Sequence, residues 1–440
     1  MKVCTVAASI SPFTGKADGF DKLRQDVLQF SRNGATPLRL VVTAMEGDTW
    51  QCEVDSLQPG DDSAALPSIE SIFAFRERRC HREHTFNAAM LIPTGADCAI
   101  GGHAGDATPA ARLLASVCDQ LIVHPNVVNA SDINEQTQNC LYVEGSVITR
   151  LLMGTVALRK KRSNRILVVT EDRGKESWVV DQTVNSTNSA RATLGADCRK
   201  VIVLNSSLAM RMSESQCGRA VGEVEGVEAL LELLARERAN YDAVALSTRI
   251  TPGEEVAHLF EKYFGGNGPN PWGGVEATLT HLISAIFGVP SAHAPTLEQL
   301  ELRTHNYGRV DPRKAAETIS TSYMFCILKG LHAAPALVLR PEGTYDPSLL
   351  SAEDISCLVV PQGCVGLPVL AAIAQGIPVI EVAENSNLMH NDLSLLPFRP
   401  EQHWCVGNFL EAAGLIAAMK AGVHPGAVRR PLSMIPVEEF

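Results

Sequence analysis

The sequence predicts an α/β fold with two Rossmann-like lobes, each built on a parallel sheet, and a small N-terminal α+β extension. From about residue 90 onward, short apolar runs alternate with longer segments of helical periodicity, which is typical of parallel strands covered by helices. The chain has 440 residues, more than the roughly 250–300 at which a single hydrophobic core stops growing. We therefore expect residues 1–89 to form the extension, 90–225 the first lobe and 226–440 the second.

The expected elements follow from these periodicities. Residues 1–7 are an apolar run that we interpret as a strand rather than a signal peptide. Residues 8–89 are polar, carry turn signals at 59–62 and end in a charged segment at 76–84, whose residues 81–84 we expect on the solvated surface. Further strands are expected at residues 90–93, 98–100, 121–124, 165–170, 201–204, 243–247, 336–339, 357–361 and 379–382. Helices with apolar residues three and four positions apart are expected at residues 107–118, 147–158, 226–238, 254–264, 274–287, 312–331, 367–375 and 409–421.

The composition argues against several classes of function. The formal net charge is -11, spread along the chain without a basic stripe, which argues against a nucleic acid as the main ligand. No apolar run reaches the roughly 18 residues of a membrane helix, so we expect a cytoplasmic protein with no membrane partner. The 12 cysteines are scattered singly without a CxxC pair, which indicates neither a disulfide framework nor a structural zinc site. The composition does not decide between a monomer and a homo-oligomer.

The strongest single feature is a glycine-rich loop at residues 101–109, between an expected strand and an expected helix. The backbone N–H groups and the dipole of such a helix start attract an anion. The predicted anion-binding residues of this loop are Gly101, Gly102, Gly105 and Thr108. His103 and Asp106 are candidate acid and base groups. The structural alternative is an ordinary turn in which Asp106 caps the helix.

A second group of polar residues follows the next expected strand, at residues 124–134, with Tyr142 and Glu144 shortly after it. His124 could move a proton, and asparagine side chains can bind both a carbonyl and an amine of a ligand. The predicted binding residues of this group are Asn126, Asn129, Ser131 and Asp132. Because the carboxyl ends of parallel strands meet at one edge of a sheet, this group should lie beside the glycine-rich loop. A capped turn is again the alternative.

A second unit of strand, glycine loop and helix occurs at residues 357–375. Cys364 lies at its turn, where N–H groups of a helix start favour a thiolate, so a nucleophile or a proton-transfer group is expected. A small buried residue is the alternative. The predicted binding residues of this unit are Gly363, Gly366 and Asn385.

Glu276 and His293 complete the predicted substrate-binding residues. Glu276 and His281 are five positions apart on an expected helix, so they do not share a face as a zinc-binding pair would. We therefore assign no metal ligands and expect no cofactor, although four histidines of the chain could converge with a carboxylate to hold a metal ion. A loop rich in Gly, Pro and Asn at residues 265–274 precedes this helix and is composed like a functional loop.

Two local resemblances concern the C-terminal unit. Residues 359–367 and 376–380, around Cys364, resemble the second cysteine motif of the cofactor-independent aspartate, glutamate and hydantoin racemases. This resemblance implies a second cysteine in the other half of the chain, for which Cys98 is the nearest candidate. Residues 101–105 and Pro109, taken with 363–378 and 387–391, resemble instead the two glycine-rich ends of GT-B glycosyltransferases, which implies a nucleotide-sugar substrate.

Taken whole, the chain is similar to a bacterial and cyanobacterial family described only as a domain of unknown function. The stretches that carry this likeness are residues 101–109, 124–133, 270–281, 290–295 and 363–378. The resemblance covers most of the chain and implies no particular activity.

Together these features predict an enzyme that binds a small anionic metabolite, a carboxylate or a phosphate, in a cleft between the lobes. The expected chemistry is cofactor-independent proton transfer of the isomerase or lyase type, with Cys364 and one of His103, His124 or Asp106 as acid and base. Nucleotide-sugar transfer is the first alternative. Non-catalytic binding of the same kind of anion is the second.

Overall fold

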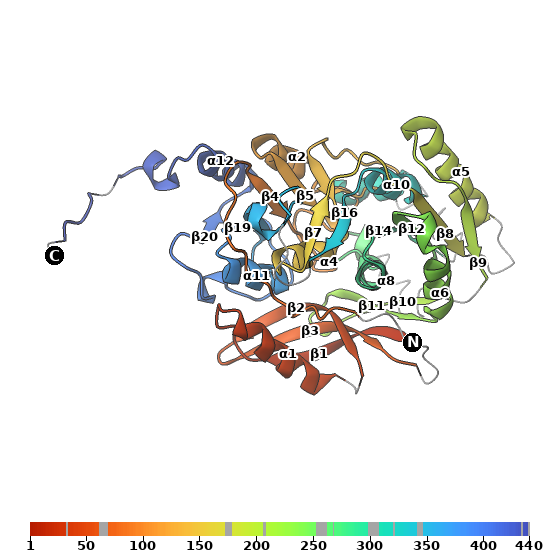
Figure 1. Ribbon diagram of the computed structural model, residues 1–440, viewed down its shortest axis with the longest axis horizontal. Helices are drawn as coiled ribbons and strands as arrows, with labels where there is room; N and C mark the ends of the chain where they lie inside the picture. The colour runs from red at the N-terminus through yellow and green to blue at the C-terminus, as the bar shows by residue number, and fades with distance from the viewer. Residues whose placement is uncertain are drawn as a thin grey trace.

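The computed structural model describes the chain except for residues 32–33, 61–68, 172–177, 206–207, 252–261, 267, 298–307, 320–321, 341–345, 433 and 439–440. Helices and strands alternate along most of the chain, and helices lie against the sheets (Figure 1). The predicted α/β class is confirmed.

The larger parallel sheet has six strands in the order β20-β19-β17-β4-β5-β6. These are β4 (Asn87–Met90), β5 (Gln120–Val123), β6 (Cys140–Tyr142), β17 (Ile355–Pro361), β19 (Val379–Val382) and β20 (His403–Val406). Helices cover both faces, with α2 against α12 on one and α4 against α11 on the other. Their bounds are α2 (Thr108–Val117), α4 (Gly145–Leu152), α11 (Leu367–Gln375) and α12 (Phe409–Lys420). Because both faces are buried, alternate residues of a strand enter different cores, as Ala88 and Ala89 do.

The smaller parallel sheet has four strands in the order β14-β12-β8-β9. These are β8 (Ile166–Glu171), β9 (Val201–Leu204), β12 (Ala243–Ser247) and β14 (Ser291–His293). The helices around it are α5 (Trp178–Leu194), α6 (Glu228–Glu237), α8 (Gly273–Phe287) and α10 (Met324–His332). Strands from both sides of residue 225 therefore occur in each parallel sheet, and the expected boundary between 90–225 and 226–440 does not separate the two sheets.

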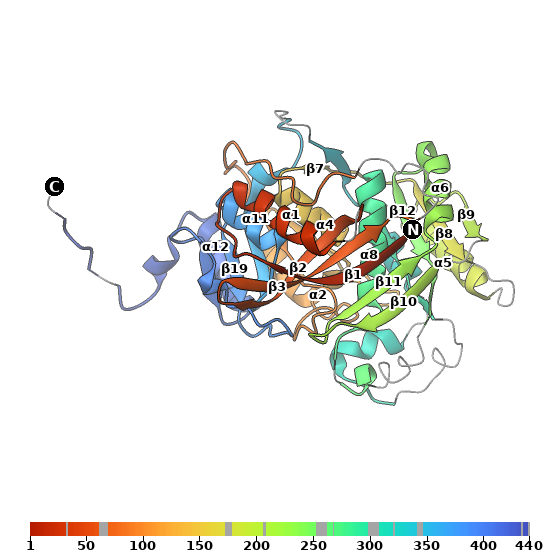
Figure 2. The ribbon, with the colours of Figure 1, turned by 90° about the horizontal axis from the view of Figure 1, so that it is seen from below.

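An eight-stranded mixed sheet lies below both parallel sheets (Figures 1 and 2). Its strands are β1 (Lys2–Ile10), β2 (Thr36–Glu46), β3 (Thr49–Gln58), β10 (Ala209–Glu214), β11 (Ala220–Glu225), β13 (Arg249–Thr251), β15 (Thr296–Leu297) and β18 (Val365–Gly366). The N-terminal strands and α1 (Asp18–Phe30) thus form an α+β unit, but later strands complete its sheet. A separate antiparallel pair consists of β7 (Val156–Arg159) and β16 (Ala336–Leu339).

Several expected elements differ in the structure. Residues 98–100 form a loop rather than a strand, because the Ile100 N–H donates to the side chain of Asn385 (2.8 Å) instead of to a neighbouring strand. The helix expected at 147–158 ends at Leu152, near Gly154 with its positive φ of 76°, and β7 follows. The helix expected at 312–331 is divided between the 3₁₀ helix η2 (Pro312–Thr318) and α10. Most of the helix expected at 254–264 lies outside the described residues.

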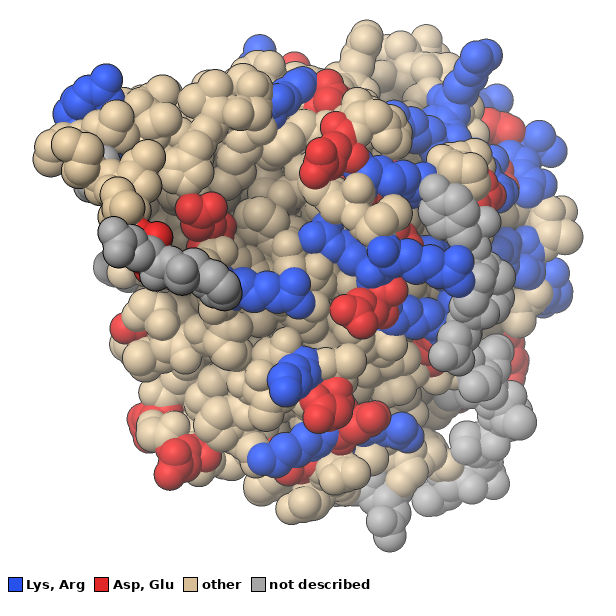
Figure 3. Space-filling model, turned by 60° about the vertical axis from the view of Figure 1, so that its left-hand side comes forward, with Lys and Arg blue, Asp and Glu red and all other residues tan. Residues whose placement is uncertain are grey.

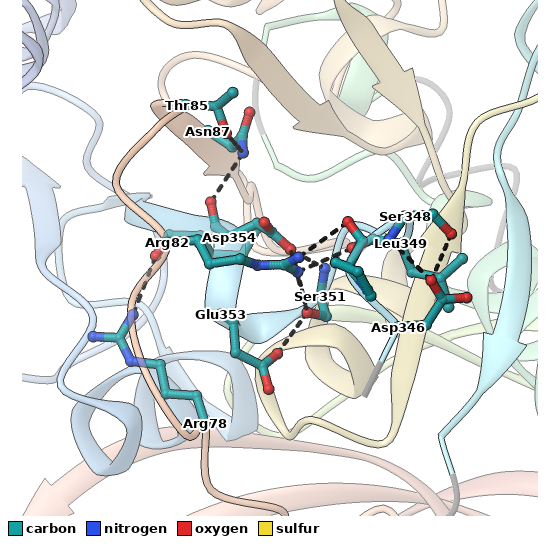
Figure 4. Close-up of polar contacts among 12 residues, drawn as sticks. Arg78, Arg82, Thr85, Asn87, Asp346, Ser348, Leu349, Ser351, Glu353 and Asp354 are labelled. Carbon is teal, nitrogen blue, oxygen red and sulfur yellow. Dashed lines mark hydrogen bonds and ion pairs between the residues drawn. The ribbon is translucent and has the colours of Figure 1, made fainter. Parts of the chain in front are cut away.

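Residues 81–84 lie largely on the solvated surface, as expected, with His81, Glu83 and His84 exposed, but Arg82 is only partly exposed and contacts the segment before β17 (Figure 4). Arg82 is ion-paired with Asp354 and donates to the backbone oxygens of Leu349 (3.0 Å) and Pro347 (3.1 Å). The two paired side chains are only 10% and 8% exposed. Arg82 therefore ties the segment before β4 to the segment before β17.

We expect Arg82→Met to lower the free energy of unfolding by about 3 kcal/mol, because removing one partner of a buried ion pair leaves the other charge uncompensated. Urea unfolding followed by circular dichroism measures the change. Arg199→Met is the matched control, since the Arg199–Asp197 pair is 72% and 37% exposed and exposed pairs contribute less than about 1 kcal/mol. Equal losses in both variants would contradict the bracing role of Arg82.

Positive and negative side chains are interspersed on the face shown in Figure 3. Within the described part of the chain, we find no helix with the length and apolar character needed to cross a bilayer.

Candidate functional site

Polar side chains associated with both parallel sheets meet in one cavity of about 100 Å³, here called the polar cavity. His124 directly follows β5, Glu144 lies just beyond β6, and His293 ends β14. In α/β proteins, ligands typically bind at the carboxyl ends of parallel strands, where these residues lie. Helix α8 adds Glu276 and His281. The sequence-predicted residues that line the cavity are Gly102, His103, His124, Asn126, Asn129, Glu276 and His293.

His281 and Glu144 form a buried pair at this cavity. Nε2 of His281 lies 2.9 Å from Oε1 of Glu144, and the Glu144 carboxylate also accepts from the backbone N–H of Ser146 (3.1 Å), capping α4. Burial by itself raises the pKa of Glu144, but His281 and Ser146 outweigh it and hold that pKa below its ordinary value. The carboxylate therefore favours the proton on Nε2 of His281. The lone pair is then on Nδ1, which has no partner among the described residues.

His124 presents a hydrogen-bond donor instead. The backbone N–H of Ile92 donates to its Nε2 (3.1 Å), so the neutral ring carries its proton on Nδ1. Burial lowers the pKa of His124 to about 4, and the ring is therefore neutral at pH 7. A Cβ at Gly145 would lie 3.5 Å from this Nδ1 and 3.6 Å from Nε2 of His281, so the two rings flank the same glycine. Neutral His124 can stabilise negative charge on a ligand, but it offers the cavity no lone pair.

Glu317 of η2 is a buried acid in the same cavity. Its Oε1 accepts from the hydroxyl of Tyr263 (2.8 Å) and from the amide of Asn270 (3.3 Å), while Oε2 has no partner within the described ranges. Burial raises the pKa of Glu317 to about 8. Its side chain is therefore protonated at neutral pH and can act as a proton donor. Lys314 fixes Tyr263 by donating to its backbone oxygen (2.7 Å).

The glycine-rich loop uses its amides internally. Asp106 accepts from the N–H groups of Gly101 (2.7 Å) and His103 (3.2 Å), and the N–H of Gly102 donates to the backbone oxygen of Asn126 (3.1 Å). These three amides are therefore occupied, which corrects the expected anion-binding role of this part of the loop. Asp106 closes the loop and does not line the polar cavity.

Close packing explains two glycines of this loop. A Cβ at Gly101 would lie 2.3 Å from Cδ1 of Ile92, and one at Gly105 would lie 2.3 Å from Cβ of Ala130. Both residues have a positive φ, and neither lines the polar cavity; nor does Thr108, at the start of α2. His103 does line it. Burial lowers the pKa of His103 to about 3, and its Nε2 has no partner among the described residues.

The second glycine loop is occupied in the same way. The N–H of Gly363 donates to Oε1 of Glu381 (3.0 Å), so this amide is not free for an anion. Asn385 donates to the backbone oxygen of Ile100 (2.8 Å) in addition to accepting from its N–H, which locks the two loops together. Neither Gly363 nor Asn385 lines the polar cavity.

Of the remaining predicted binding residues, Glu276 and His293 line the polar cavity, whereas Ser131 and Asp132 do not. His293 has partners at both nitrogens, Glu276 (2.9 Å) and Thr248 (2.8 Å), and burial raises the pKa of Glu276. Ser131 is fully buried with a φ of 49°. Asp132, whose pKa burial raises to about 6, faces a different hollow beside α5. The predicted binding roles of Ser131 and Asp132 therefore do not belong to the polar cavity.

Asn126 and Asn129 are both tied to the walls of the cavity. Asn126 donates to the backbone oxygens of Ile92 and Pro93 (both 3.1 Å). Asn129 accepts from the hydroxyl of Tyr142 (3.1 Å). These contacts fix both amides without help from a ligand.

Cys364 and Gly366 line a second cavity of about 110 Å³, here called the apolar cavity. Four residues line both cavities, namely Thr94, His124, Gly145 and His281. A hydrogen bond to Cys364, together with burial, raises the pKa of Cys98 well above its ordinary value. The cysteine pair implied by the racemase resemblance is thus in direct contact.

Two further acids of the polar cavity differ in what the sequence reveals of them. Glu144 lies shortly after the polar residues 124–134, whereas Glu317 is a single acid in an unremarkable segment. Asn270 and Trp272, which also line the cavity, belong to the Gly, Pro and Asn-rich loop. Its unusual composition is the one signal that could have found them. Within the described part of the chain, no three His, Cys, Asp or Glu residues are grouped to hold a metal ion.

Comparisons with known proteins give a family and one relative. A family described as "Protein of unknown function (DUF3326)" matches residues 87–429. An uncharacterized lipoprotein of Synechococcus sp. is 34% identical over 350 residues, which cover 78% of this chain and 93% of the relative. No solved structure matches significantly.

Proposed function

The chain belongs to the DUF3326 family, and from that premise we propose that it is an enzyme that transfers protons on a small anionic metabolite, of the isomerase or lyase type and independent of a cofactor. One observation carries the proposal. Three polar atoms without a partner among the described residues, Nε2 of His103, Nδ1 of His281 and Oε2 of Glu317, belong to side chains that line the same cavity. Buried polar atoms are normally hydrogen-bonded, so a polar ligand is the natural partner for all three.

The chemistry follows from the state of each group. His281, oriented by Glu144, accepts the proton of the substrate at Nδ1. Neutral His124 donates from Nδ1 to the oxygen on which negative charge develops, in the manner of a preorganised oxyanion donor. Glu317, protonated at neutral pH, returns a proton to carbon or to a leaving group. Glu317, an acid whose pKa burial raises, and His281, a base held in one tautomer by Glu144, supply the two groups that such a reaction requires.

Cys364 offers a second version of the same proton transfer. It lies in the apolar cavity, whose wall also includes His124, and its neighbour Cys98 keeps a raised pKa and so stays a thiol that can donate to Cys364. Activity retained in Cys364→Ala protein would remove the thiol from the mechanism and leave His281 as the base. Activity lost there but kept in His281→Gln protein would favour the thiol.

We also propose that the protein is located in the cytosol. All 12 cysteines are unpaired, and disulfides are rare in reducing compartments. The name of the Synechococcus relative suggests a lipid anchor for that protein. Cell fractionation distinguishes the two locations, since a lipid anchor would place this chain in the membrane fraction.

Incubation with a bacterial metabolite extract in D₂O tests the function. We expect at least one carboxylate or phosphate to gain deuterium at carbon or to be consumed with the native protein, because the base exchanges its proton with solvent. High-resolution mass spectrometry measures this. His281→Gln protein should lose the effect, and His424→Gln, at an exposed histidine, should keep it. An extract that changes equally with native, His281→Gln and Cys364→Ala protein would contradict the proposal, and binding without change would favour a non-catalytic protein.

A further inference from the structure

The apolar cavity adjoins the polar cavity and differs from it in chemistry. Leucines and isoleucines from several segments line it, among them Leu38, Ile72 and Leu367. It lies between the N-terminal strand β2 and the helices α4, α8 and α11, and His124 and His281 stand in the walls of both cavities. A ligand that reaches both cavities would therefore have one apolar part and one reactive part.

Three arginines line the apolar cavity, and one of them lacks a carboxylate partner. Arg39 is paired with Asp55 (2.8 Å), and Arg219 is paired with Glu53. Arg150 has no ion pair among the described residues, and its Nη1 donates only to the backbone oxygen (3.2 Å) and hydroxyl (3.5 Å) of Ser284. A guanidinium in apolar surroundings is costly unless it is paired with a negative group.

The surroundings of Arg150 favour an external anion. Burial lowers its pKa, which shows that the charged form is penalised there, although Glu144 and Glu70 partly offset this. Glu144 is engaged with His281, and Glu70 is engaged with Arg76. A bound carboxylate would complete the charge balance of Arg150 through the planar, bidentate contact that guanidinium groups make.

We propose that the apolar cavity binds the hydrocarbon part of an amphipathic carboxylate, whose anionic group pairs with Arg150. In this proposal the anionic group of the ligand binds Arg150 and not the two glycine loops, where backbone amides such as those of Gly101 and Gly363 already donate within the protein. The inference rests on the proposed function only for the statement that the ligand's other end reaches His281 in the polar cavity. Binding at Arg150 needs no proton transfer.

Calorimetric titration of the full chain with octanoate and octanamide tests this, because the two probes differ mainly in charge. We expect octanoate to bind about 10- to 100-fold more tightly than octanamide, as charged hydrogen bonds contribute. In Arg150→Met protein we expect octanoate to lose about this factor and octanamide to bind as before. Unchanged octanamide binding shows that the cavity is still folded. Arg211→Met, at an arginine paired with Glu225 on the surface, is the matched control and should bind both probes normally.

Equal affinities for the two probes, no binding of either, or unchanged octanoate binding in Arg150→Met protein would overturn the inference. Tighter binding of octyl phosphate than of octanoate would overturn the choice of a carboxylate. The proposed function fails separately. Octanoate binding without any deuterium incorporation counts against the enzyme alone, and incorporation that does not depend on Arg150 counts against the carboxylate site alone.

Discussion

Replacing Glu144 with glutamine is expected to lower the rate of deuterium incorporation by about 100- to 10,000-fold. Glutamine keeps the size of the side chain and an oxygen that can cap α4 at Ser146. It removes the negative charge that fixes the tautomer of His281 and stabilises the imidazolium formed when Nδ1 takes a proton. The loss should therefore appear in kcat, measured on the metabolite that the D₂O experiment identifies.

A matched exchange elsewhere separates this effect from general damage. His424 and Glu401 form an exposed pair with the same 2.9 Å separation, so Glu401→Gln removes a carboxylate of the same kind far from any proposed role. We expect native kcat in that variant. Near-ultraviolet circular dichroism should show that Glu144→Gln protein retains its tertiary structure. A folded Glu144→Gln protein with a native rate would exclude His281 as the base.

The elements that could be predicted are those with a clear apolar period. The strand expected at 243–247 matches β12 residue for residue, and the helix expected at 367–375 matches α11. Helix α5 was not predicted from the sequence, because its buried positions are Val179, Thr183, Thr187 and Ala190. Two of these four are threonines, which a search for apolar residues does not count, although α5 packs against β8. The helical spacing of buried positions was present in the sequence, but the threonines did not identify it as an apolar pattern.

The site was predictable only where chain neighbours determine it. His124, Asn126 and Asn129 directly follow a strand, and that position alone places them at a sheet edge. The occupied amides of the glycine loop were not predictable. Asp106 could cap a helix or close its own loop, and only the three-dimensional path of the backbone decides between them. The partners of the histidines lie far away in sequence, as His281 and Glu144 do, so no local spacing reveals the pair.

The shared wall of the two cavities explains why residues of unlike chemistry belong to one site. His124 and His281 contact both volumes, so a ligand can be held by hydrocarbon contacts and by Arg150 on one side and meet acid and base groups on the other. Binding energy from a part of the substrate that does not react can then position the part that does. The occupied glycine loops support these walls by fixing the ends of β5 and β17.

The free energy of unfolding should fall as the pH rises from about 4.5 to about 8, the ordinary and raised pKa values of Glu317, by up to about 1.4 kcal/mol per pH unit. The folded state keeps the proton over this interval, whereas the unfolded state releases it. The contribution of Glu317 to the stability of the folded state is therefore complete below pH 4.5, its ordinary pKa, and is lost as the pH rises through its raised pKa of about 8. Over the whole interval the loss approaches about 4 kcal/mol for this group.

Glu317→Gln protein isolates that contribution, because glutamine cannot ionise while its amide can still accept from Tyr263. Urea unfolding at several pH values should give a native stability that declines relative to the variant as the pH increases. Glu83→Gln, at a side chain that is 85% exposed, should give a curve parallel to the native one. Parallel curves for native and Glu317→Gln protein would show that Glu317 ionises at its ordinary pKa. It would then be a carboxylate at neutral pH, and the proposed proton donor would be absent from the polar cavity.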